Sequence, residues 1–84
     1  MTAPIVTDQE LAAIEQSVVD APFDSYVLRQ LAVTYLQLGR PVDAIPLLVR
    51  AIAEDADPAD HTNLIYARGQ AAIQILERKA QPAS

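Results

Sequence analysis

The spacing of apolar residues between positions 25 and 58 limits the fold of this chain more than any other feature. Apolar residues recur there at every third or fourth position, which places them along one face of a helix. The first set consists of Leu28, Leu31, Ala32, Tyr35 and Leu38, and the second consists of Ala44, Ile45, Leu48, Val49, Ala51 and Ile52. Each set predicts one amphipathic helix that buries its apolar face.

Gly39 separates the two sets and predicts a tight turn between them. Glycine is expected just past a helix end, because the backbone there takes a left-handed conformation in which a Cβ atom is costly. Pro58 and the acidic residues before it close the second helix. Residues 25–58 are therefore expected to fold back on themselves as an antiparallel helical hairpin.

In the order and spacing of its residues, this segment resembles a tetratricopeptide (TPR) repeat, a helix–turn–helix unit of about 34 residues. The residues that carry the resemblance are Leu28, Leu31, Ala32, Tyr35, Gly39, Ala44, Leu48 and Ala51. The chain departs from the family pattern at four positions. Leucine replaces the leading tryptophan, alanine replaces the first glycine, leucine replaces the phenylalanine, and the closing proline comes late. The resemblance covers one complete repeat, residues 25–58. An ordinary helical hairpin with a glycine turn is the alternative.

The start of the second helix has two interpretations, because Pro41 and Pro46 both lie near it. Proline is tolerated in the first turn of a helix but removes a hydrogen bond farther in. If Asp43 is the cap, Pro46 falls in the first turn. If the helix starts at Pro41, as a TPR-like repeat suggests, Pro46 bends it. We favour the start at Pro41.

A further helix is predicted on each side of the hairpin. Thr7 and Glu10 have the T-x-x-E spacing of a capping box, in which each side chain accepts a hydrogen bond from a backbone N–H at the helix start. The leading helix is expected over residues 8–20 and ends before Pro22. On the other side, a longer C-terminal helix is expected over residues 58–79.

The start of the C-terminal helix is marked by Asp57, Pro58 and Asp60. These residues suit the roles of cap, proline at the first helical position and capping-box acid. The sequence as a whole thus predicts an all-α fold of antiparallel helical hairpins, TPR-like, with about four helices in a single domain, 1–84. The predicted core comprises Leu11, Ile14, Val18, Leu28, Leu31, Ala32, Tyr35, Leu38, Ala44, Ile45, Leu48, Ala51, Ile52, Ile65, Ala72 and Leu76.

Gly69 lies inside the predicted C-terminal helix, where glycine costs about 1 kcal/mol relative to alanine. Close approach of another helix is the common reason for such a glycine. Ala67, Ala71 and Ala72 lie nearby and keep this part of the helix surface small and flat. The neighbouring helix is either the preceding one of the same chain, the interpretation we favour, or a helix of a second copy.

Composition argues against several classes of partner. The 84 residues carry a formal net charge of −5, so no nucleic acid is expected as a partner, because its phosphates need a basic surface. The same charge disfavours anionic membranes, and no apolar run approaches the roughly 18 residues of a spanning helix. The N-terminal residues do not form a signal peptide, and there is no cysteine. We therefore expect a soluble, cytoplasmic protein.

No arrangement of residues in the sequence indicates catalysis, so an enzyme is not expected. His61 is the only histidine, whereas a zinc site needs three or four ligands, usually including cysteine or several histidines. Ser17 and Ser25 have no histidine at a spacing suited to a triad, and there is no glycine-rich phosphate loop. We predict no catalytic residue, no metal site and no cofactor.

The resemblance to TPR repeats implies a protein–protein interaction module, acting as a scaffold or adaptor. TPR-like repeats bind partners on a concave side formed by the outward positions of the first helix of each repeat. Carried over to this sequence, the candidate partner-binding residues are Tyr26, Arg29, Gln30, Val33, Gln37, Asn63 and Gln70. We expect a shallow groove for a protein or peptide partner, in which Arg29 can bind a carboxylate by paired hydrogen bonds. A solvated helix face is the alternative.

Assembly is the alternative function. Helical repeats need about three copies to bury a continuous core, and this chain has one complete repeat with flanking helices. Either the flanking helices cover both sides of the repeat, or apolar helix faces stay exposed and pair with another chain. In the second case the chain is a small obligate homo-oligomeric or secretion-chaperone-like subunit, of which a homodimer is the simplest form.

Overall fold

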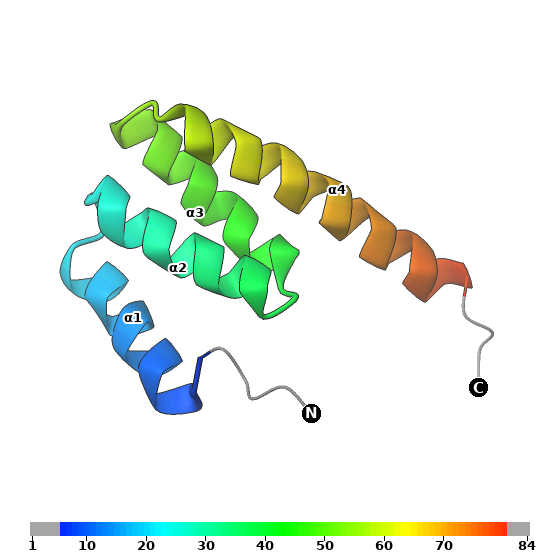
Figure 1. Cartoon of the computed structure of the whole chain (residues 1–84), viewed down its shortest axis with the longest axis horizontal. Helices are drawn as coiled ribbons and strands as arrows, with labels where there is room; N and C mark the ends of the chain where they lie inside the picture. Colours follow the sequence, from blue (N-terminus) through cyan, green and yellow to red (C-terminus); the bar gives the residue numbers. More distant parts are fainter. Residues whose placement is uncertain (1–5, 81–84) are drawn as a thin grey trace.

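The computed structural model describes residues 6–80 and contains four α-helices (Figure 1). They are α1 (Asp8–Asp20), α2 (Ser25–Gln37), α3 (Pro41–Glu54) and α4 (Pro58–Ala80). No strand occurs within residues 6–80, so the predicted all-α fold of helical hairpins is confirmed. The two ends of the predicted 1–84 domain, residues 1–5 and 81–84, lie outside the described residues.

The helices follow one another as successive antiparallel neighbours. Helix α3 folds back along α2, and α4 folds back along α3, while α1 packs against α2 at the opposite edge (Figure 1). Helix α4 also touches α2, but over a shorter length than it touches α3. Helix α2 is therefore the one element that contacts all three others, and its residues have a different environment on each side.

The turn between α2 and α3 depends on Gly39, as predicted. Gly39 has a φ of 73°, in the left-handed region, and is the only described residue outside the negative-φ range. Its N–H donates to the carbonyl of Leu36 at 3.1 Å, and the N–H of Arg40 donates to the carbonyl of Tyr35 at 2.8 Å. These two bonds satisfy carbonyls at the end of α2 in the manner of a Schellman motif.

Two other predicted helix starts are also observed. The N–H of Glu10 donates to the Thr7 hydroxyl at 3.1 Å, which caps α1. The Glu10 carboxylate accepts from the Thr7 hydroxyl and not from its backbone N–H, so only half of the capping box forms. Helix α3 begins at Pro41, which leaves Pro46 inside the helix. There the ring removes the hydrogen bond that the carbonyl of Val42, which is exposed, would accept.

The core lies between α2 and α3 and extends onto α4. Its buried apolar side chains come mainly from the predicted stripes of the hairpin: Leu28, Leu31, Ala32, Tyr35, Ala44, Leu48 and Ala51. Three residues of α1 that were predicted to be core, Leu11, Ile14 and Val18, are only partly buried, because α1 packs against α2 alone. Leu38, Ile45 and Ile52, also predicted to be core, are only half-buried, and Val49, expected on the apolar face of α3, is 52% exposed. The predicted cores of the hairpin and of the leading helix are therefore each confirmed in part.

The predicted core face of α4 is wrong. Ile65 is 73% exposed, Leu76 is 65% exposed and Ala72 is also exposed. The residues that face the body of the protein are instead Asp60, Leu64, Ala67 and Ala71. The observed inward face lies one residue before the predicted one along the sequence, so the helix is rotated by about 100° about its axis relative to the prediction. The small side chains of Ala67 and Ala71 let α4 approach α3 closely.

The interpretation of Gly69 as a contact site for α3 is also wrong. Gly69 is exposed, and a Cβ atom added there would have no described neighbour within 4 Å beyond its own helix backbone. A second copy, the other alternative that the sequence left open, is compatible with this exposure. The helix therefore carries a glycine in its middle without any packing partner among residues 6–80 to account for it.

Polar contacts of Tyr35 connect three helices at the edge of the core. Its hydroxyl donates to the carboxylate of Glu15 on α1, and the guanidinium of Arg40 lies 4.4 Å from the centre of its ring. Arg40 also donates to Asp43 at 2.8 Å. Burial of the ring, followed by the hydrogen bond to Glu15, raises the pKa of Tyr35 above its ordinary value of 10.0.

This raised pKa predicts a loss of stability in alkali. Above pH 10.0, the ordinary tyrosine value, the unfolded chain ionises Tyr35 before the folded protein does. The stability contributed by the neutral side chain is therefore complete below that pH and is lost as the pH rises through the folded-state pKa. We expect Tyr35→Phe to remove part of the alkaline fall in the thermal midpoint, measured by circular dichroism. An unchanged alkaline limb in the variant would contradict this expectation.

The core assignment predicts a large effect of charge at Leu31, which is 4% exposed. Leu31→Asp places an unpaired carboxylate between α2 and α3, so it should cost about 4 kcal/mol or more and abolish the cooperative thermal transition. Val49→Asp is the matched control, because Val49 is 52% exposed on the solvent side of α3. It should retain a sharp transition. A sharp transition in Leu31→Asp would show that this stripe is not buried.

Candidate partner-binding groove

The outward side of α2 carries a hollow that is built from the predicted site residues. It has a volume of about 350 Å³ and is lined by Tyr26, Arg29, Gln30, Val33, Thr34 and Gln37. All six come from α2, and five of them were nominated from the sequence. They gather because the buried face of α2 is occupied by Leu28, Leu31 and Tyr35, which leaves the opposite side of the helix to solvent.

A second hollow joins α2 to α4. It has a volume of about 360 Å³ and is lined by Val33, Leu36, Gln37, Asn63 and Tyr66. The two hollows share Val33 and Gln37, so they form one surface, called here the α2–α4 groove. Asn63 is thereby brought together with the residues of α2, as the sequence predicted.

The residues that line the α2–α4 groove differ from the predicted set at Tyr66, which was not predicted, and at Gln70, which was predicted but lies outside. Tyr66, which is 54% exposed, lines the second hollow. Its position three residues after Asn63, on the same side of a helix, was a signal that could have identified it. Gln70 was nominated with Asn63 from the resemblance to TPR repeats but lines neither hollow. It lies half-buried one turn farther along α4.

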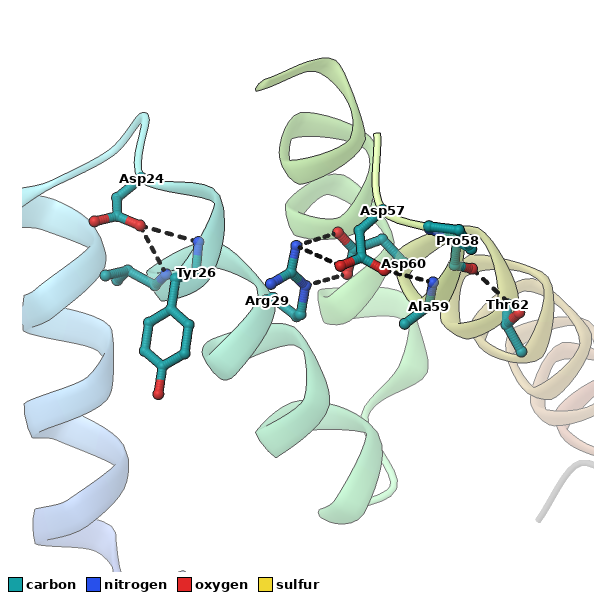
Figure 2. Close-up of polar contacts among 9 residues, drawn as sticks. Asp24, Tyr26, Arg29, Asp57, Pro58, Ala59, Asp60 and Thr62 are labelled. Atoms are coloured by element: carbon teal, nitrogen blue, oxygen red, sulfur yellow. Dashed lines mark hydrogen bonds and ion pairs between the residues drawn. The ribbon is translucent and has the colours of Figure 1, made fainter. Parts of the chain in front are cut away.

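Arg29 differs from the other groove residues because its charged group already has a partner in the chain. Its Nε and Nη2 atoms donate to the two carboxylate oxygens of Asp60 at 2.6 and 2.8 Å (Figure 2). Asp57 lies 3.7 Å from the same guanidinium. The carboxylate that Arg29 was expected to take from a partner is therefore supplied by the start of α4.

The burial of Asp60 makes this pair a structural interaction. The Asp60 side chain is 0% exposed, and Arg29 is 24% exposed. A buried carboxylate is tolerated only when it is paired and hydrogen-bonded, and here both oxygens accept from one planar guanidinium. The hydrogen bond to Asp60 raises the pKa of Arg29 above its ordinary value. The pair holds α2 and α4 together across 31 positions of sequence.

Local caps place both partners of the pair. Asp24 caps α2 by accepting from the N–H groups of Tyr26 and Val27 at 2.9 and 3.3 Å. At the start of α4, Asp57 accepts from the N–H of Ala59 at 2.8 Å (Figure 2). The predicted capping role of Asp60 is therefore wrong. Its carboxylate turns away from the helix start and towards Arg29, where it compensates a cation.

The remaining groove chemistry is neutral. Among the residues that line the two hollows, Arg29 is the only charged one, and its guanidinium is paired. Amide side chains are contributed by Gln30, Gln37 and Asn63, and aromatic surface by Tyr26 and Tyr66. Within residues 6–80, no three or more His, Cys, Asp or Glu side chains converge in a way that could hold a metal ion. No described helix is both long enough and apolar enough to cross a bilayer.

Comparison of the chain with protein-family models, with curated proteins and with solved structures found no match in any of the three. The resemblance to TPR repeats therefore stays a prediction from the residues named above.

Breaking the buried pair should be costly, and the cost should depend on which partner remains. Arg29→Met leaves the carboxylate of Asp60, which is 0% exposed, without a compensating charge, so we expect a loss of about 3 kcal/mol or more in the free energy of unfolding. Asp60→Ala should cost less, because Arg29 is 24% exposed and keeps Asp57 at 3.7 Å. In Arg29→Met/Asp60→Ala neither charge is left without its partner, so this double variant should lose less stability than the two single variants, Arg29→Met and Asp60→Ala, lose together. Urea denaturation of the unmodified protein, both single variants and the double variant measures the coupling energy.

The exposed pair of Arg40 and Asp43 is the control for this cycle. Both side chains are more than 40% exposed, so Asp43→Ala should change stability by about 0.5 kcal/mol or less. Additive losses at Arg29 and Asp60 would contradict a coupled buried pair.

Proposed function

We propose that this chain is a TPR-like protein–protein interaction module that binds a peptide segment of a partner in the α2–α4 groove. The observation that carries the proposal is the clustering of Tyr26, Arg29, Gln30, Val33 and Gln37 around one hollow. Residues nominated for partner binding thus share a concave surface that continues onto α4. The succession of α2, α3 and α4 as antiparallel neighbours is also the arrangement that stacked helical repeats use.

The chemistry of the groove defines the class of peptide. Because the Arg29 guanidinium is paired with Asp60, the groove does not select its ligand by a free cation. The amides of Gln30, Gln37 and Asn63 offer donors and acceptors to a peptide backbone. Tyr26, which is 67% exposed, and Val33 offer apolar surface. A neutral peptide with an apolar anchor side chain fits this set better than an acidic C-terminus.

The proposal includes no catalytic step, no cofactor and no nucleic acid. The net charge of −5 would repel a phosphate backbone. A cytoplasmic location is part of the proposal and is supported by the absence of cysteine, which suits a reducing compartment.

Selection from a library of displayed peptides tests the proposal. Selected peptides should be neutral with one large apolar residue, and Val33→Glu should weaken their binding at least tenfold, because it places a charge between the two hollows. Val49→Glu, on the solvent side of α3, is the matched control and should bind as the unmodified protein does. Binding is measured by fluorescence polarisation, and thermal melts check that both variants remain folded. Equal affinities of Val33→Glu and the unmodified protein would place the binding surface elsewhere.

A further inference from the structure

The outer face of α4, opposite the face that packs on the body, is apolar. Between Asp60 and Glu77 the only formally charged residue is Arg68. Ile65 and Leu76 are 73% and 65% exposed, and Ile73 and Ile75 are about half exposed beside them. Water-facing helix surfaces normally carry the charged residues of an amphipathic helix, so this face lacks the composition of a solvated surface.

The outer face has the spacing and symmetry of a helix–helix contact. Its central line consists of Ile65, Gly69, Ala72 and Leu76, at intervals of four, three and four residues, which is the alternation of a coiled-coil seam. We call these four residues the α4 seam. Read in either direction, the seam runs large, small, small, large. A twofold interface requires such self-complementarity, because each copy presents the same patch to the other.

The packing of α4 within the chain ends before the helix does. The side chain of Gln74 donates to the carbonyl of Gly39 at 3.1 Å, which marks where α4 passes the turn before α3. Beyond this point α4 continues to Ala80 and projects away from the other three helices (Figure 1). Ile75 and Leu76 therefore lie where the described part of the chain offers little surface to cover them.

We infer that the α4 seam is covered by the α4 seam of a second copy, in an antiparallel homodimer. In this arrangement Ile65 meets Leu76 of the other copy, and Gly69 meets Ala72 of the other copy, so that the backbones approach at the small residues. Gly69, which no contact among residues 6–80 accounts for, is accounted for by this close approach.

Charge favours the antiparallel orientation. The chain leading into α4 carries Glu54, Asp55 and Asp57, whereas the last turn carries Arg78 and Lys79 beside one acid, Glu77, and is net basic. An antiparallel pair brings the basic end of each helix towards the acidic end of the other and opposes the two helix dipoles. A parallel pair would place the acidic ends together. Arg68 lies at the edge of the seam, where its aliphatic stem can cover Ile75 of the other copy.

The dimer surface is separate from the α2–α4 groove, because none of the four seam residues lines either hollow. The inference therefore does not depend on the proposed function. Sedimentation equilibrium of the full chain, from low micromolar to submillimolar concentration, tests it first. The mass should rise from 9.1 kDa to twice that value. In Ile65→Glu/Leu76→Glu it should stay at the monomer value across the range, while circular dichroism shows the helices retained.

Val19→Glu is the matched control, since Val19 is 71% exposed on α1 and lies outside the seam. It should dimerise as the unmodified chain does. A monomeric mass for the unmodified chain at every concentration would overturn the inference, and so would a dimer that survives in Ile65→Glu/Leu76→Glu. Peptide binding by the groove, measured on the same proteins, would fail or succeed independently of either result.

Cross-linking tests the orientation, because the chain has no cysteine of its own. In the antiparallel dimer, residue 65 of one copy lies about 16 Å along the axis from residue 65 of the other, too far for a disulfide, which needs Cα atoms within about 7 Å. Ile65→Cys/Leu76→Cys should therefore oxidise rapidly to a covalent dimer, whereas Ile65→Cys alone should not. Rapid cross-linking of Ile65→Cys alone would indicate a parallel pair and overturn the antiparallel dimer.

Discussion

The ion pair between Arg29 and Asp60 is the interaction on which the arrangement of this protein depends. A carboxylate that is 0% exposed must have its charge compensated within the fold, and the guanidinium of Arg29 compensates both of its oxygens. This requirement fixes how α4 is rotated about its own axis. Once Asp60 faces α2, the residues that share its side of the helix, Leu64, Ala67 and Ala71, must face inwards. Ile65 lies one position beyond Leu64, and Leu76 lies five positions beyond Ala71, so both must face outwards.

The sequence predicts the ends of the helices better than their rotation, because the two depend on different interactions. A helix end is specified within a few residues: the left-handed turn needs Gly39, the cap of α1 needs Thr7, and α3 starts at a proline. The rotation of α4 depends on a contact between residues 31 positions apart. Two adjacent stripes of α4 have helical spacing, and the more exposed one holds the larger apolar residues. Hydrophobic pattern alone therefore favours the wrong stripe, and the deciding residue, Asp60, resembles a capping acid in sequence.

The same distinction separates the parts of the candidate site. The residues of α2 that line the groove could be predicted, because they are what remains once Leu28, Leu31 and Tyr35 are assigned to the core. The state of Arg29 could not, because a guanidinium that is free in sequence becomes paired only when α4 is placed beside it. This pairing changes the chemistry of the groove from cationic to neutral, although the list of residues hardly changes. A correct set of lining residues is thus not sufficient to name the class of ligand.

Apolar residues are unevenly distributed between the interior and the surface of this chain, and this imbalance is the physical reason to expect association. Apolar residues make up 51% of the sequence, yet the largest fully buried side chains are Leu28, Leu48 and the carboxylate Asp60. Much of the remaining core is alanine, which excludes little surface from water. A domain of this size has few apolar contacts to oppose its conformational entropy, while three isoleucines and one leucine of α4 stay outside. Covering them with a second copy adds the apolar burial that the core lacks, and the stability of the folded chain then rises with its concentration.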